Sequence, residues 1–310
     1  MNDTDKLVYQ DLKEIEAHAQ HAMRLLMDEP NKPSRPNRPI KNIALSAFSA
    51  RLNAVLFNGR MNDTQRNCVS LFAFSLTYMD ILGRDIFYQY LAYMIATVYH
   101  ETAFTMESIE EYGKGEGRPY GEPDSRTGQI YYGRSYPQLT WYDNYEKASK
   151  ELFSKNLEQG KVDFLNKPEL ILEPFFGVQV TVFGMLGGWF TGRALEDYWL
   201  DNGQYDYVEA RRIINGTDKA NTIAGYAREV ESAILLAMGN EIERATLSVG
   251  SRGDDVRELQ LALNISPDGV FGSGDTQPAL IEYQEEHKLT PDGVCGSSTW
   301  RSIEREVYGL

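Results

Sequence analysis

The stretch Tyr88-Gln-Tyr-Leu-Ala-Tyr-Met-Ile-Ala-Thr-Val-Tyr-His-Glu-Thr102 stands out because almost all of its first dozen residues are apolar or aromatic. No residue between Asp85 and His100 carries a charge. A run of this length exceeds a usual strand and is typical of a helix that the core surrounds on most sides. We therefore predict a buried helix here and expect the rest of the chain to be organised around it.

His100, Glu101 and Thr102 place ionisable chemistry at the end of this helix. Burial disfavours the charged form of a carboxyl group, so desolvation raises its pKa, and a general acid needs such a raised pKa. The alternative is that Glu101 simply emerges into solvent. A zinc-protease motif is excluded because Phe104 stands where its second histidine must be. No metal ion or other cofactor is expected.

Glycoside cleavage by an acid and a base needs a second carboxylate, and the candidates are Glu107, Glu110 and Glu111. On one continuous helix, ten residues would separate two groups by about 15 Å, which is too far. Because the glycines from Gly113 onward allow the chain to turn back, a separation of roughly 6.5–9.5 Å, suited to an inverting enzyme, becomes possible. The alternative is a solvated helix end rich in glutamate.

The composition is that of an ordinary soluble protein, with 42% hydrophobic and 25% charged residues among 310. The net charge of −14 argues against a nucleic-acid partner and an anionic membrane surface, since both attract clustered Lys and Arg. Residues 175–190 are apolar but short, so we expect a core helix there and no membrane span. Cys68 and Cys295 are expected to be free thiols in a reducing cytoplasm. Residues 1–7 show no conventional signal peptide.

The chain divides into three regions. Residues 1–40 combine an amphipathic helix over 5–28 with a proline-rich linker over 29–39. Residues 41–244 are predicted to be mainly α-helical, with a glycine-rich stretch over 113–135 that is typical of a long loop or a small irregular hairpin. The pattern is helical from about residue 41, and a helix follows residues 62–64 through Cys68, Phe72 and Leu76. After the predicted buried helix and the glycine-rich stretch, helical patterns resume at about 141–157, 174–190, 205–214 and 220–244.

Helix-capping residues mark two of these starts. The segment Asn62-Asp-Thr64 offers capping oxygens before a helix that Gly83 ends. Asp85 is placed to cap the helix that follows. The fold class that we expect is mainly α.

Residues 246–310 form a separate unit with an internal repeat. The segment Pro267-Asp-Gly-Val-Phe-Gly-Ser273 recurs as Pro291-Asp-Gly-Val-Cys-Gly-Ser297, at an offset of 24 residues. Asp-Gly turns between short helical segments predict a small bundle, and no catalytic cluster is visible in it. Its three helices are expected at 254–263, 278–287 and 298–307.

The central region carries an ordered set of motifs: His100-Glu-Thr102, Tyr131-Tyr-Gly-Arg-Ser-Tyr-Pro-Gln-Leu-Thr-Trp-Tyr-Asp-Asn-Tyr145 and Ile213-Ile-Asn-Gly216. They resemble, in this order, the motifs of the family-19 glycoside hydrolases. The segments 184–192 and 211–218 also look like the lysozyme-like branch of that family, which is found in bacteriophage endolysins. The resemblance spans roughly residues 60–235 and implies a lysozyme-like α-helical catalytic domain.

The C-terminal unit carries a second, independent resemblance. The segment Val249-Gly-Ser-Arg-Gly-Asp-Asp-Val-Arg-Glu-Leu-Gln260 and the two Asp-Gly-Val turns are similar to the three-helix peptidoglycan-binding module. Both resemblances point to the same polymer, the peptidoglycan of the bacterial cell wall.

The family-19 resemblance implies roles for individual residues. Glu101 matches the general acid, which protonates the leaving glycosidic oxygen. The second carboxylate, which activates water, falls at Glu110 or Glu111. Glu111 is favoured because the run that leads to it looks one residue longer than the commoner form. Thr140 matches the hydroxyl residue that helps to hold the water.

The same resemblance implies a sugar-binding cleft. Tyr131 and Tyr132 would offer flat faces to sugar rings, with ordinary core tyrosines as the alternative. The chain departs from the family pattern at Ser135, Pro137 and Asp143, in or beside a loop whose backbone shape matters. The polar residues expected to contact substrate, some through amides that can pair with N-acetyl groups, are His100, Gln138, Asn144 and Asn215.

The leading hypothesis is a monomeric endolysin that hydrolyses the β-1,4-glycosidic bonds of peptidoglycan by an inverting mechanism. We expect it to be made in a host cytoplasm and to act on the wall after the membrane is permeabilised. One alternative is a chitinase on the same fold. Another is a non-catalytic wall-binding or virion structural protein.

Overall fold

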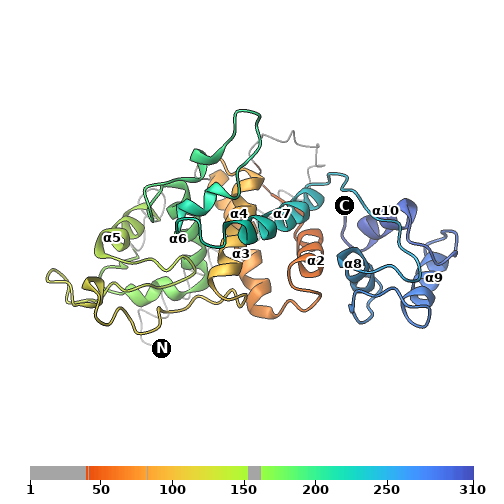
Figure 1. Cartoon of the computed structure of the whole chain (residues 1–310), viewed down its shortest axis with the longest axis horizontal. Coiled ribbons are helices and arrows are strands. Elements are labelled where there is room, and N and C mark those ends of the chain that lie inside the picture. Colours follow the sequence, from red (N-terminus) through yellow and green to blue (C-terminus); the bar gives the residue numbers. More distant parts are fainter. Residues whose placement is uncertain (1–39, 41, 82, 153–161) are drawn as a thin grey trace.

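The computed structural model describes residues 40, 42–81, 83–152 and 162–310 (Figure 1). Within these ranges the protein has nine α-helices and no β-strand, apart from isolated bridges, so the predicted mainly-α fold is confirmed. The helix expected over 5–28 and the linker expected over 29–39 lie outside the described residues. In the described ranges, every helix is too short or too polar to cross a bilayer.

The central region contains six of these helices and four short 3-10 helices. The α-helices are α2 (Leu45–Val55), α3 (Asp63–Ile81), α4 (Tyr88–Glu101), α5 (Tyr142–Glu151), α6 (Pro174–Leu186) and α7 (Ala220–Ala237). The 3-10 helices are η1 (Pro119–Gly121), η2 (Pro168–Leu172), η3 (Leu195–Tyr198) and η4 (Glu209–Ile213). The pattern at 205–214 therefore forms a 3-10 turn rather than an α-helix. The pattern at 220–244 ends early because Gly239, with a φ of +74°, follows α7 in a left-handed conformation.

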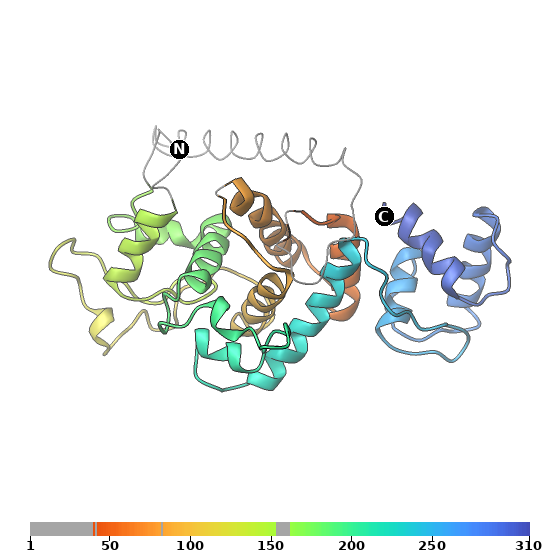
Figure 2. The same ribbon diagram turned by 90° about the horizontal axis from the view of Figure 1, so that it is seen from above.

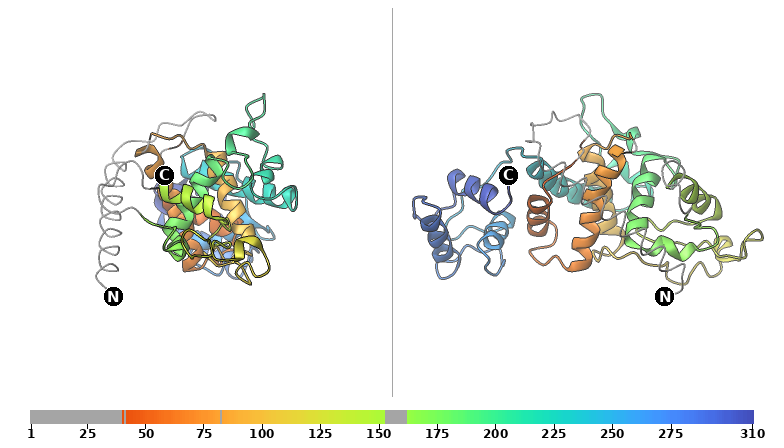
Figure 3. Two further views of the ribbon diagram at one scale, coloured as in Figure 1. Left: turned by 90° about the vertical axis from the view of Figure 1, so that its left-hand side faces the viewer. Right: turned by 180° about the vertical axis from the view of Figure 1, so that it is seen from behind.

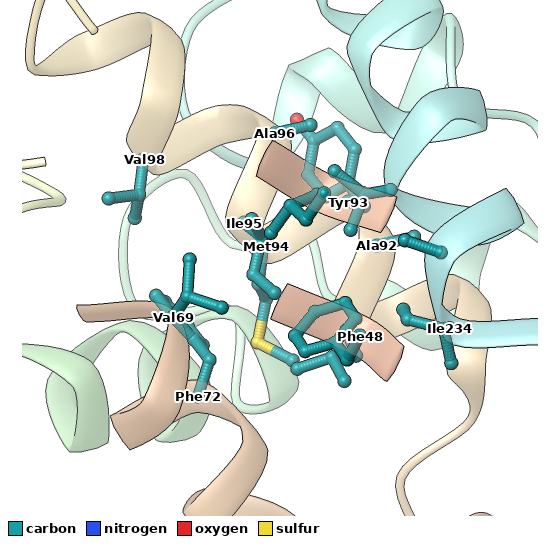
Figure 4. Packing of buried hydrophobic residues seen from close by; sticks show 14 of the residues in the cluster. Phe48, Val69, Phe72, Ala92, Tyr93, Met94, Ile95, Ala96, Val98 and Ile234 are labelled. Carbon is teal, nitrogen blue, oxygen red and sulfur yellow. The ribbon is translucent and has the colours of Figure 1, made fainter. Parts of the chain in front are cut away.

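Helix α4 is the buried centre of this region, as predicted. All of its residues from Tyr88 to Val98 are buried. Helix α7 packs along both α4 and α2, and α6 packs on α3 (Figure 2). Figure 4 shows the result, with Met94 of α4 among side chains from three other helices. These neighbours are Phe48 of α2, Val69 and Phe72 of α3, and Ile234 of α7.

One of the two predicted caps is present. Asn62 Oδ1 accepts a hydrogen bond from the Gln65 N–H at 2.9 Å, and Gln65 Oε1 accepts one from the Asn62 N–H at 2.8 Å, which is a reciprocal capping arrangement. The prediction for Asp85 is wrong. The N-cap of α4 is Phe87, whose side chain makes no cap, because the chain stays extended until that residue.

The chain reverses direction after α4 and forms the predicted irregular loop. Ala103, Phe104 and Met106 all have positive φ values, which ends the helix within one turn of Glu101. The chain then returns so that Glu110 forms an antiparallel bridge with Arg134. The candidate second carboxylates therefore do not continue the helix that carries Glu101.

The C-terminal unit is a bundle of α8 (Asp254–Ala262), α9 (Thr276–Glu286) and α10 (Ser297–Glu306). Its sequence repeat is also a repeat of hydrogen bonds. The buried amide of Gln260 accepts from the Gly269 N–H at 2.8 Å and donates to Asp268 at 2.8 Å. Gln284 makes the same two bonds in the second copy of the turn, to Gly293 and Asp292. Each Asp-Gly turn is thus fixed by a glutamine from the preceding helix.

This bundle lies at one end of the molecule and packs against α2 (Figure 3). The contact is charged and buried. Arg51 Nη1 of α2 lies 2.7 Å from both Asp255 Oδ1 and Glu258 Oε2 of the bundle. Arg244 Nη1 lies 2.6 Å from the same Glu258, whose side chain is fully buried. The two parts of the chain therefore share one ion-pair cluster.

Candidate active site

Glu101 is the last residue of α4 and is held by an arginine from a distant segment. Arg211 Nη1, on η4, lies 2.5 Å from Glu101 Oε1. The Arg211 side chain is only 2% exposed, and its Nε donates to the Asp218 carbonyl at 2.8 Å. The Glu101 side chain keeps 24% of its surface exposed. Glu101 is therefore a partly accessible carboxyl in a defined position and not a solvated helix end. The apolar environment that the sequence led us to expect for this carboxyl is not present, because a guanidinium lies beside it.

Glu111 is held at both of its carboxylate oxygens. Oε1 accepts a hydrogen bond from the Tyr120 hydroxyl at 2.9 Å, and Oε2 accepts one from the Gly133 N–H at 3.0 Å. A Cβ on Gly133 would lie 2.8 Å from Gln138 Oε1 and 3.2 Å from Glu111 Cβ. A side chain at position 133 would displace the Gln138 amide and crowd Glu111, so the glycine lets Glu111 and Gln138 approach one another.

Glu110 makes a different set of contacts. Its carboxylate lies 2.7 Å from Lys114 Nζ, accepts a short hydrogen bond from the Tyr132 hydroxyl, and lies 3.7 Å from Arg134 Nε. The hydrogen bonds from Lys114 and then Tyr132 lower the pKa of Glu110 below its usual value. Consecutive residues of an extended segment point to opposite sides. Glu110 and Glu111 are therefore separated by their backbone geometry as well as by their partners.

Three of the predicted polar residues are linked to one another by hydrogen bonds in the segment that follows Gly133, and one of them, Gln138, lies near Glu111. Thr140 Oγ1 donates to the Gln138 carbonyl at 2.9 Å, and Asn144 Nδ2 donates to the Thr140 carbonyl at 2.9 Å. The Gln138 side-chain amide donates to the Ser135 carbonyl at 2.9 Å. These bonds fix the tight turn between the Arg134 bridge and α5.

The role expected of Tyr131 and Tyr132 needs correction. They are only 3% and 6% exposed, so neither ring offers a face to a sugar. The Tyr131 hydroxyl donates to the Leu165 carbonyl at 2.8 Å, and the guanidinium carbon of Arg134 lies 3.6 Å from the centroid of the Tyr132 ring. Both are core tyrosines. The exposed rings of this region belong to Phe104, Tyr112 and Trp141.

The remaining predicted residues lie beside Glu101. His100 precedes it on α4, and the Asn215 N–H donates to the Arg211 carbonyl at 3.0 Å. Within the described ranges, no hydrogen bond or ion pair joins this group to the group around Glu111, and no cluster of metal-binding side chains is present. The site thus consists of two separately supported carboxylates.

Sequence reasoning assigned no role to Arg211. The ion pair with Glu101 joins residues 110 positions apart, so no local pattern indicates it. The available signal is the pair Arg211-Arg212 between the apolar residues Ala210 and Ile213, since an arginine that is buried there requires a partner.

Comparison with known families identifies one part of the chain. Residues 252–303 match a family described as "Putative peptidoglycan binding domain", and they span α8, α9 and most of α10. The chain therefore carries a peptidoglycan-binding domain near its C-terminus. No curated protein matched the chain.

Proposed function

We propose, on the premise of this peptidoglycan-binding domain, that the central region hydrolyses the glycan strands of peptidoglycan. The observation that carries the proposal is the pair of positioned carboxylates. Glu101 is held by the buried Arg211, and Glu111 is held by Tyr120 and Gly133. A glycosidase needs two such groups, one acid and one base, in one chain.

In the proposed reaction, Glu101 gives its proton to the glycosidic oxygen as the bond to the anomeric carbon breaks. Glu111 takes a proton from a water molecule, whose oxygen attacks that carbon from the opposite face of the ring. One water is consumed, and the configuration at the anomeric carbon is inverted. The Thr140 hydroxyl, close to Gln138 in the turn beside Glu111, would help to hold the water.

Glu111 suits the base role better than Glu110. The carboxylate of Glu110 is already engaged by Lys114, Tyr132 and Arg134, so a water molecule would have to displace a salt bridge. Among the residues that the structure describes, the hydrogen-bond donors to Glu111 are neutral, and Glu111 lies beside Gln138. A carboxylate without a cationic partner is the better proton acceptor.

The proposal is tested by lysis of permeabilised Gram-negative cells. Glu101→Gln and Glu111→Gln should each lower the rate of turbidity loss by at least about 10²-fold, because each removes an acid–base group. Glu110→Gln should retain most of the activity. Glu116→Gln, at an exposed acid of the same loop, is the matched control.

Analysis of digested sacculi separates the alternatives. Mass spectra should show new reducing sugar ends. Cut peptides on intact glycan strands would overturn the glycosidase proposal. Cleavage of chitin without cleavage of sacculi would favour the chitinase alternative, and wall binding without any cleavage would favour a structural role. We further propose that the enzyme acts at the cell wall as a monomer.

A further inference from the structure

A pocket of about 440 Å³ lies next to Glu111, between residues 119–126 and the start of α5. Tyr120 connects the two places, because it lines the pocket and donates its hydroxyl to Glu111. The volume falls within the usual range for ligand sites. None of the roles assigned above uses this pocket.

Two aromatic rings form part of its wall. The rings of Tyr120 and Trp141 meet edge to face, with centroids 5.3 Å apart. Trp141 is 50% exposed, and its backbone has a φ of +74°, which is unusual for a residue with a side chain. The Trp141 N–H donates to the Tyr131 carbonyl at 2.9 Å, which helps to hold this conformation. An exposed tryptophan kept in a strained backbone is a common feature of binding sites.

The charges of the pocket are unbalanced. Its lining contains three carboxylates, Glu122, Asp124 and Asp143, and one cation, Arg126. Arg126 is already paired, because its Nε and Nη2 lie 2.9 Å and 2.6 Å from the two oxygens of Asp124. Its guanidinium carbon also lies 3.2 Å from the centroid of the Tyr142 ring.

The other two carboxylates are less engaged. Among the described residues, Glu122 and Asp143 have no side-chain hydrogen bond and no ion pair within 4 Å, although Asp143 also interacts electrostatically with Arg126. Carboxylates beside exposed aromatic rings suit an organic cation, since the ammonium group is attracted by both. A neutral sugar would use the carboxylates only as hydrogen-bond acceptors, whereas a cation would also gain from their charge and an anionic group would be repelled.

We propose that this pocket binds the amino group of the diamino acid in the peptide stem of peptidoglycan. The proposal rests on the proposed function, because it assumes a peptidoglycan strand at Glu111. The protein would then recognise the peptide as well as the glycan, with Glu122 and Asp143 pairing with the ammonium group and Trp141 covering it.

The test compares two substrates and two variants of the full chain. Soluble glycan strands with free stem amines are compared with the same strands after acetylation of those amines. For the wild-type protein, acetylation should lower kcat/KM by about two- to fivefold, the loss of roughly one exposed charge contact. In the double variant Glu122→Gln/Asp143→Asn, acetylation should have no effect. The matched control is Glu116→Gln/Asp201→Asn, at exposed acids away from the pocket.

Binding is measured separately in the Glu101→Gln background, by tryptophan fluorescence with an amine-bearing muropeptide and its acetylated form. Because the C-terminal domain is unchanged in all variants, its contribution cancels in the comparison. Equal sensitivity to acetylation in wild type and double variant would overturn the pocket proposal. The pocket proposal would also be overturned if Trp141→Ala lost activity while acetylation of the substrate had no effect. That result would indicate that the pocket binds a sugar. If the wild-type protein cleaves no glycan but binding still depends on the free amine, the proposed reaction is refuted and the pocket proposal stands.

Discussion

At the scale of single residues, the position of Glu101 depends on Arg211. A guanidinium presents its donors in a planar fork, whereas a lysine ammonium is a point charge on a flexible stem. Arg211 uses two different nitrogens, one for Glu101 and one for the Asp218 carbonyl. It is a positioning residue, because it acts on substrate only through Glu101.

Arg211→Lys should therefore lower kcat by about 10²-fold with little change in KM, since the acid is misplaced while sugar contacts remain. The thermal unfolding midpoint should fall only slightly, because a cation remains in the buried site. Steady-state kinetics on soluble glycan strands and a melting curve check both parts. An unchanged kcat would mean that the ion pair does not position the acid.

At the scale of elements, the loop from Glu110 to Arg134 is held by a titratable contact. The pKa of Glu110 is lowered from an ordinary value of 4.5 by its bonds to Lys114 and Tyr132. A group whose pKa is lower in the folded state stabilises the fold above its unfolded-state pKa and loses that contribution as pH falls through the folded-state pKa.

The free energy of unfolding should therefore differ between wild type and Glu110→Gln at pH 7, with the wild type more stable. The difference should shrink once the pH falls below about 4.5. Urea unfolding at a series of pH values measures it, with Glu116→Gln as the control. A difference that stays constant with pH would contradict the assignment of the contact.

The helices and turns could be predicted from the sequence better than the contacts between distant residues. Helix α4 and the repeated Asp-Gly turns were predictable because their signals are local: an uncharged run, and two copies of one segment. The cap predicted at Asp85 is absent because the N-cap of α4 is Phe87, which lies later in the chain. Burial of Tyr131 and Tyr132 and the pairing of Arg211 depend on packing between distant segments, which periodicity does not encode.

At the scale of the whole molecule, the buried charge cluster joins the two parts of the chain. Arg51 of α2 and Arg244 both bind Glu258, and the Ser46 hydroxyl donates to the Tyr308 carbonyl at 2.6 Å. Removal of one partner from a buried ion pair leaves the other charge uncompensated, which is costly. The C-terminal domain should thus be held at a fixed angle to the central region.

Arg51→Met should lower the free energy of unfolding by about 1–2 kcal/mol, less than the loss of a sole partner, because Arg244 still pairs with Glu258. It should also speed tryptic cleavage between residues 238 and 246. Arg305→Met is the control, because Arg305 is exposed and, among the described residues, pairs with its neighbour Glu306; it should change stability by about 0.5 kcal/mol or less. Limited proteolysis and urea unfolding give the two measurements. Equal protease resistance in the two variants would show that the cluster does not hold the domains together.

The same cluster has a consequence for how the protein would move over its polymer. A binding domain on a flexible tether lets the attached enzyme search a sphere around the anchor, with a radius set by the tether. A docked domain gives no such search. Each time the domain binds the wall, the enzyme would reach only the glycosidic bonds at one fixed distance from the binding point. Successive cuts would therefore require the domain to dissociate from the wall. The rate of wall digestion would then follow the rate of release rather than the rate of chemistry.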